Sequence, residues 1–163
     1  MKPFWIVTVC AMLVGCDFTV PLVTTPALDI DRAIMGVWAR TNGQNQTERL
    51  LVLPLDQRQY LVAYPAGEAH TMYAKGCLAK CADKTFVQLE WFGTAEGKEP
   101  DDTRVYQLVT YALKGDELTV RIVNTDVVRK DAKTSADLAK SIEENKAKPD
   151  LLGDPMVFKK AAP

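Results

Sequence analysis

Seven short segments between residues 37 and 124 most constrain the fold of this chain. Each is rich in Val, Leu, Thr and aromatic residues and is bounded by Gly, Pro, Asn or Asp. Such segments predict β-strands, and strands so closely spaced along the chain predict an antiparallel meander. The expected strands are 37–41, 48–54, 59–64, 69–74, 85–92, 104–113 and 117–124.

The alternation of side chains within these segments indicates how the sheet is buried. In the fifth segment, Val87, Leu89 and Trp91 alternate with Gln88 and Glu90. This pattern predicts a sheet with one apolar face and one wet face. Closing such a sheet on itself removes its exposed edges, so we expect a curled sheet or a small closed barrel.

Two helical segments flank the strands. Residues 28–35 predict one or two helical turns that end before Gly36. Residues 131–147 predict a helix of about three turns, capped by Thr134 or Ser135 and ended before Pro149, lying on the sheet or across one mouth of a barrel. Residues 154–160 predict a final strand. The expected fold is therefore mainly β, with about eight strands and one C-terminal helix before the last of them.

The beginning of the chain has the layout of an export signal. Lys2 precedes an apolar run over residues 3–12, and Leu13-Val14-Gly15-Cys16 follows. This stretch resembles the signal peptide and lipobox of bacterial lipoproteins. In that family the chain is cut before the cysteine, whose sulfur carries a diacylglyceryl group and whose amine is usually acylated, for example with palmitate. The resemblance implies that Cys16 is the lipidated first residue of the mature chain and attaches it to a membrane.

Two alternatives to a lipobox are weaker. The 14 uncharged residues between Lys2 and Asp17 would span roughly 21 Å as a helix, less than the hydrocarbon core of about 30 Å. An uncleaved membrane helix is therefore too short. A plain export signal fits the apolar run, but it does not require a cysteine after the small residues.

These features divide the chain into three parts. Residues 1–15 are expected to be a cleaved signal peptide, 16–27 a lipidated cysteine with an extended tether, and 28–163 a single β-rich domain. Removing 15 of the 163 residues leaves 148, enough for one core. Two prolines make the tether extended, with a reach of about 30 Å. In enterobacterial lipoproteins an aspartate after the cysteine retains the protein at the periplasmic face of the inner membrane, which Asp17 implies here; the outer membrane is the alternative.

Cys77 and Cys81 are the cysteines left once Cys10 leaves with the signal and Cys16 takes lipid. An even pair in an exported protein predicts a disulfide, which would fix a turn at residues 78–80. The alternative is a soft-metal site for Cu(I) or Zn that adds His70 and Met72. We favour the disulfide and expect no resident metal.

A second resemblance concerns the β domain. Gly36-Val37-Trp38 opens the first expected strand, and Thr125-Asp126 follows the seventh. These residues are similar to two motifs of lipocalin-like barrels, although Val127 replaces the tyrosine of the second motif. The resemblance implies that Trp38 closes one end of a barrel beneath a basic residue, Lys159 or Lys160. The alternative is that Trp38 is an ordinary core aromatic.

Composition and motifs argue against nucleic-acid binding and catalysis. Without Lys2 the chain has 19 basic and 21 acidic residues, so it lacks the basic excess that nucleic-acid binding needs. His70 is its one histidine, there is no Gly-x-Ser-x-Gly motif, and neighbouring acids such as Asp101-Asp102 point in different directions. We therefore expect no catalytic residues and no cofactor.

Two non-catalytic functions are left. We favour a membrane-anchored lipoprotein that acts as an envelope interaction or assembly module, with a barrel filled by its own side chains. The alternative is a lipocalin-like binder of a small apolar ligand, because binding pockets favour aromatic linings. The aromatic residues expected to line such a pocket are Trp38, Tyr60, Tyr64, Tyr106 and Tyr111.

Overall fold

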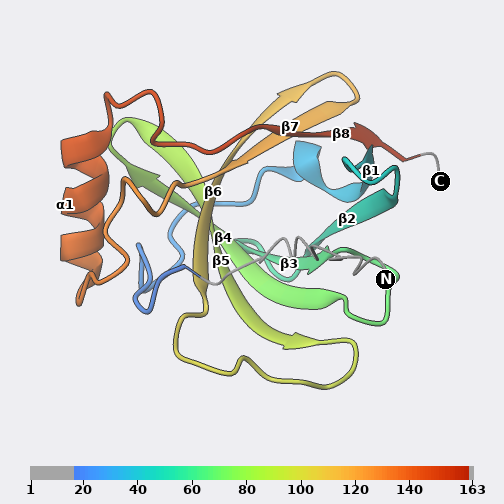
Figure 1. Ribbon diagram of the computed structural model, residues 1–163, viewed down its shortest axis with the longest axis horizontal. Coiled ribbons are helices and arrows are strands. Elements are labelled where there is room, and N and C mark those ends of the chain that lie inside the picture. Colours follow the sequence, from blue (N-terminus) through green and yellow to red (C-terminus); the bar gives the residue numbers. More distant parts are fainter. Residues whose placement is uncertain (1–16, 162–163) are drawn as a thin grey trace, which may run out of the picture.

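Eight antiparallel strands close into one barrel in the computed structural model, which describes residues 17–161 (Figure 1). Each strand pairs with its neighbours in sequence, and β8 pairs with β1 to complete the barrel. The predicted mainly β fold, with one helix before the last strand, is confirmed. The strands are β1 (Gly36–Thr41), β2 (Thr47–Pro54), β3 (Gln59–Tyr64), β4 (Met72–Cys81), β5 (Lys84–Thr94), β6 (Tyr106–Lys114), β7 (Glu117–Ile122) and β8 (Met156–Lys160).

The expected signal peptide and the lipidation site Cys16 lie outside the described residues. Within residues 17–161, no helix is long and apolar enough to cross a membrane.

One end of the barrel is closed by the chain that enters β1. A short 3-10 helix, η1 (Arg32–Ile34), precedes Gly36, whose φ of +121° suits a residue without a Cβ. The indole Nε1 of Trp38 donates a hydrogen bond to the carbonyl of Ile34 at 2.8 Å. Lys160 Nζ lies 4.6 Å from the centre of the Trp38 ring and donates to the carbonyl of Met35 at 2.9 Å. Trp38 and Lys160 thus have the arrangement that the Gly-x-Trp resemblance implies.

The fourth strand is longer than the sequence pattern suggested, and this makes the predicted disulfide wrong. β4 runs straight through Cys77 to Cys81, and the chain turns afterwards at Ala82 and Asp83, whose φ angles are +51° and +62°. Residues four apart in one strand are about 13 Å apart, whereas a disulfide needs Cα atoms within about 7 Å. Both cysteines are accordingly free thiols.

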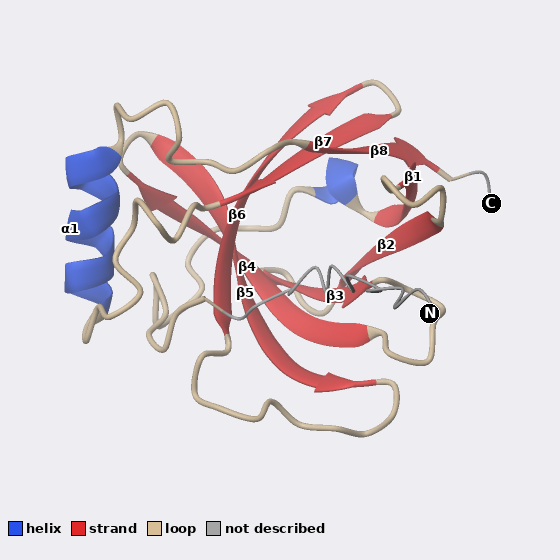
Figure 2. Cartoon of the chain, viewed as in Figure 1, coloured by secondary structure: helices blue, strands red, loops and turns tan. Residues whose placement is uncertain are grey.

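Helix α1 (Ser135–Asn145) lies outside the barrel wall rather than across its mouth (Figure 2). Thr134 and Asp137 form a capping box, in which each side chain bonds the other's backbone N–H. The apolar face of the helix is buried in a second core, between the helix, the outer side of β4–β6 and the N-terminal segment. The buried members of this core are Phe18, Leu22, Ala79, Phe86, Leu108, Val123, Val128, Ala132, Leu138, Ile142 and Leu151.

Residues 17–23, here called the N-terminal strap, lie packed on the barrel. Phe18 exchanges two backbone hydrogen bonds with Tyr106 and is fully buried. The side chain of Gln88, on the outer face of β5, accepts from the N–H groups of Leu22 and Val23 and donates to the carbonyl of Val23. This packing differs from the solvated tether that the prolines suggested.

Candidate ligand-binding cavity

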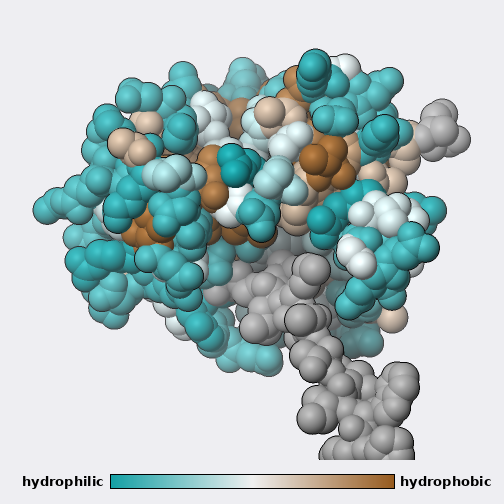
Figure 3. Space-filling view, turned by 45° about the horizontal axis from the view of Figure 1, so that its top comes forward, coloured by the Kyte–Doolittle hydropathy of each residue, from teal (hydrophilic) through white to brown (hydrophobic). Residues whose placement is uncertain are grey.

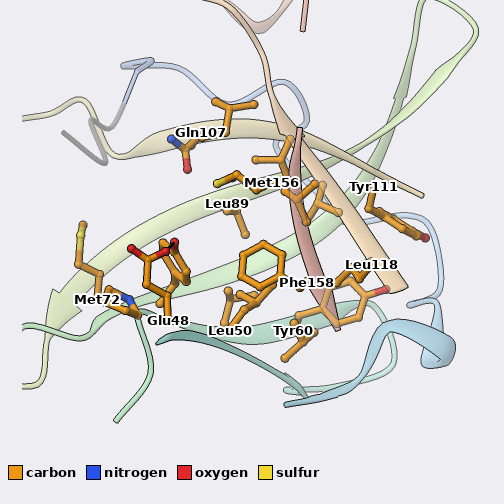
Figure 4. A pocket seen from close by; sticks show the side chains of 18 of the residues that line it. Glu48, Leu50, Tyr60, Met72, Leu89, Gln107, Tyr111, Leu118, Met156 and Phe158 are labelled. Atoms are coloured by element: carbon orange, nitrogen blue, oxygen red, sulfur yellow. Dashed lines mark hydrogen bonds between the residues drawn. The ribbon is translucent and has the colours of Figure 1, made fainter. Parts of the chain in front are cut away.

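The barrel encloses a cavity of about 780 Å³. All eight strands contribute inward-facing side chains to its wall, and Figure 4 shows these side chains converging from the surrounding strands. The volume lies within the range of small-molecule sites, about 300–1,000 Å³. The lining residues that the strands contribute are Arg40, Glu48, Leu50, Val52, Tyr60, Val62, Tyr64, Met72, Val87, Leu89, Trp91, Thr94, Gln107, Val109, Tyr111, Leu118, Val120, Ile122, Met156 and Phe158.

The middle of the cavity is apolar. Leu50, Leu89 and Phe158 lie there, between Glu48 at one end and Tyr60 at the other (Figure 4). A ligand held by these residues would make dispersion and hydrophobic contacts over most of its length.

A polar cluster stands at the end of the cavity away from η1, where β1, β2 and β3 meet the loops. Arg40 Nη2 and Nε lie 2.7 and 2.8 Å from Glu48 Oε2. Asn42 Nδ2 donates to Glu48 Oε1 at 2.9 Å, and the Tyr64 hydroxyl donates to Glu48 Oε2. The Arg40 guanidinium also lies 5.5 Å from the centre of the Phe158 ring. The carboxylate of Glu48 therefore organises the polar end of the cavity.

The ionisation of this cluster follows from its contacts. Burial alone would raise the pKa of Glu48, but hydrogen bonds from Tyr64, Asn42 and Arg40 bring it below the ordinary value. Burial and the neighbouring Glu48 raise the pKa of Tyr64 to about 12. At neutral pH the cluster thus consists of one cation, one anion and one neutral phenol, so it presents polarity to a ligand without net charge.

The cavity reaches solvent at this same end. His70, in the loop between β3 and β4, borders the cavity while its side chain is 70 % exposed. Pro65 and Thr94 border it from the same loop and from the end of β5. We call this the open end; it is opposite the end that η1 and Trp38 close.

At the closed end, two tyrosine hydroxyl groups bind the segment that precedes β1. The Tyr60 hydroxyl accepts a hydrogen bond from the N–H of Asp31 at 2.5 Å. The Tyr111 hydroxyl donates to Asp31 Oδ2 at 2.9 Å. Burial, with the nearby Asp31 carboxylate, raises the pKa of Tyr111 well above its usual range. These two phenols hold the segment before β1 and present their ring faces to the cavity.

The five aromatic residues predicted to line a pocket separate into two groups. Tyr60, Tyr64 and Tyr111 line the cavity. Trp38 is buried below it at the closed end, and Tyr106 faces outward beside the strap.

Several lining residues were not among the predicted site residues. Leu50, Leu89 and Phe158 form the apolar middle, and Arg40 and Glu48 form the polar end. Side chains alternate between the two faces of a strand, and this period of two was the signal that could have identified them. It would have applied once Tyr60 and Tyr64 were assigned to the inward face.

The alternative metal site is not assembled. Met72 faces the interior, whereas Cys77 and Cys81 face outward, toward Gln88 and helix α1 respectively. Burial raises the pKa of both thiols, which disfavours the thiolate that a metal would require. Among residues 17–161 there is also no group of three His, Cys, Asp or Glu side chains placed to hold a metal ion.

Comparisons with protein-family models, with curated proteins and with solved structures find no match to this chain.

Proposed function

We propose that this protein binds a small, elongated apolar ligand inside its barrel. The observation that supports the proposal is the 780 Å³ cavity, apolar along its middle and polar at its open end. A ligand with an apolar body and one uncharged polar group matches this distribution. Its body would contact Leu50, Leu89 and Phe158, and its polar group would reach the Arg40–Glu48 pair.

The size of the cavity favours a long ligand over a small fragment. Burying about 300 Å² of apolar ligand surface yields about 7.5 kcal/mol at 25 cal/mol per Å². Micromolar affinity requires about 8 kcal/mol after the cost of association has been met. The ligand must therefore bury more surface than this, which requires it to extend along most of the barrel.

We further propose that the protein does this at a membrane surface in the bacterial envelope. The Leu13-Val14-Gly15-Cys16 box supports a lipid on Cys16 as the anchor. Two or three acyl chains give stable attachment, whereas one gives only marginal binding. Asp17 favours the periplasmic face of the inner membrane, with the outer membrane as the alternative.

A matched pair of variants tests the ligand-binding proposal. Leu50 faces the cavity and its neighbour Leu51 faces outward, so Leu50→Trp obstructs the middle of the cavity while Leu51→Trp leaves it open. Titration with a fluorescent fatty-acyl probe should show at least a tenfold weaker affinity for Leu50→Trp and an unchanged affinity for Leu51→Trp. Equal binding by both variants would contradict the proposal.

An envelope interaction module is the second candidate. Val37, Leu53 and Leu55 are exposed apolar side chains on β1, β2 and the loop after β2, which a protein partner could cover. On the face drawn in Figure 3, however, apolar residues form separate patches among hydrophilic ones. The barrel also holds a cavity instead of the filled interior expected for this module. Cross-linking in intact cells should trap one specific partner if this second function is the correct one.

A further inference from the structure

The first described residues are fixed to the barrel rather than hanging from it. Asp17 N–H donates to the carbonyl of Tyr106 at 2.9 Å, and Phe18 bonds Tyr106 in both directions at 3.0 and 3.1 Å. The Phe18 side chain is buried in the second core. The start of the strap therefore has a defined place on the barrel wall.

That place is the rim of the cavity. Tyr106 is the first residue of β6, which runs from the open end toward the closed end. The next residue, Gln107, lines the cavity, and its Nε2 lies 3.4 Å from Asp17 Oδ2. Asp17 is thus in contact with a residue of the cavity wall at its open end.

Cys16 directly precedes Asp17 in the sequence. Consecutive Cα atoms are about 3.8 Å apart, so the lipid proposed on Cys16 begins one residue from the rim. An anchor this short holds the barrel against the membrane, where a free tether of residues 16–27 would have held it about 30 Å away.

An aromatic pair with one exposed member, Phe92, lies at the same end. Phe92 is 45 % exposed and stacks on Tyr73, with ring centres 6.4 Å apart. The residue before Phe92, Trp91, donates its N–H to the carbonyl of Val105, which directly precedes Tyr106. Aromatic side chains are favoured at membrane–water interfaces, so Phe92 suits contact with lipid headgroups.

The charges of the loop between β5 and β6 indicate which kind of lipid surface the open end would fit. Glu96 pairs with Lys98 at 2.6 Å and Asp102 with Arg104 at 2.5 Å. Glu99 and Asp101 add two negative charges. Anionic lipids would be repelled by this loop, whereas a zwitterionic bilayer would not.

We infer that the open end of the barrel faces the bilayer, with Phe92 in contact with a zwitterionic phospholipid surface. A ligand would then pass between the bilayer and the cavity with little exposure to water. This inference rests on the proposed lipid anchor and not on the identity of the ligand.

Two tryptophan substitutions test the orientation in the lipidated protein bound to phosphatidylcholine vesicles. Phe92→Trp reports from the open end and Leu55→Trp from the loop after β2, at the closed end; Leu55 is 49 % exposed and so matches Phe92. Brominated phosphatidylcholine carries bromine on its acyl chains and quenches tryptophan side chains that enter the bilayer. Relative to the unsubstituted protein, it should reduce the added emission of Phe92→Trp about twofold and leave that of Leu55→Trp nearly unchanged. Equal quenching of the two variants would overturn the inference.

A linker and a flotation measurement separate the possible failures. Ten Gly and Ser residues inserted between Cys16 and Asp17 should abolish the quenching of Phe92→Trp while the protein still floats with vesicles. Persistent quenching with the linker would show that the short anchor does not set the orientation. If the protein did not float with vesicles, the proposed lipid anchor would be wrong, and so would the inferred orientation. The ligand-binding proposal would still be tested separately, by probe binding to the Leu50 and Leu51 variants. Weaker quenching in zwitterionic than in anionic vesicles would contradict the chosen surface.

Discussion

At the scale of single residues, the Arg40–Glu48 pair is the feature of the cavity whose burial costs the most folding free energy. Both side chains are mostly buried, at 16 and 18 % exposure, so each charge depends on the other. The Tyr64 hydroxyl and Asn42 complete the coordination of the carboxylate. Such a pair stabilises a barrel less than well-packed apolar side chains of similar volume would.

Removing one partner of this pair should be more harmful than removing both. Glu48→Leu leaves the mostly buried Arg40 cation without its counter-ion and should lower the free energy of unfolding by about 3 kcal/mol. Combining it with Arg40→Met should recover the loss to within about 1 kcal/mol of the original value. Urea unfolding of the two single variants and the double variant measures this coupling. Additive losses would show that the two side chains do not interact.

The cysteines give a second prediction at this scale. Because Cys77 and Cys81 are separated along one strand, both should be free thiols. When the protein is unfolded without reductant and treated with iodoacetamide, mass spectrometry should find an adduct on each. In the folded protein the alkylation of Cys77 should be slow, since the thiol is buried and its pKa is raised. A native sample in which neither cysteine reacts after unfolding would show that they are paired.

At the scale of elements, propensity and turn residues predicted most strands well. Residues 59–64 were predicted and found as β3, and Asn42-Gly43 lies in the turn after β1. The predicted end of the fourth strand was wrong because Cys-x3-Cys was interpreted as a disulfide turn. The turn is instead formed by Ala82 and Asp83, which have left-handed conformations. Ala is rare in that conformation, so the sequence held no clear turn signal there.

The packing of the N-terminal strap on the barrel could not be predicted from local sequence patterns either. Its attachment depends on Gln88, 66 residues away from Leu22. Contacts of that separation are fixed by the closed barrel and leave no periodic pattern in the sequence.

Gln88 gives the prediction for this element. Gln88→Ala leaves the N–H groups of Leu22 and Val23 without their acceptor, a loss of about 1–3 kcal/mol. Hydrogen exchange at residues 18–23 should accelerate at least tenfold, while exchange in β1–β3 stays the same. Glu90→Ala, at the next outward-facing position of β5, is the control. Unchanged exchange in the strap would mean that Phe18 alone holds it.

At the scale of the whole molecule, the sequence predicted a small barrel but not whether it is hollow. An eight-stranded barrel can be filled by side chains or hold one small ligand, depending on strand tilt and stagger. Those quantities follow from the register of every strand pair, which a list of strands does not determine. The 780 Å³ interior is therefore a property of the assembled barrel.

Native mass spectrometry of the protein extracted from its own membrane in mild detergent tests the central claim most directly. We predict a mass above that of the lipidated chain, which falls when apolar molecules are extracted with organic solvent. The Leu50→Trp variant, with the middle of its cavity obstructed, should lose most of the added mass, and Leu51→Trp should keep it. No added mass on any of the three proteins, each having only the mass of its own lipidated chain, would contradict the account.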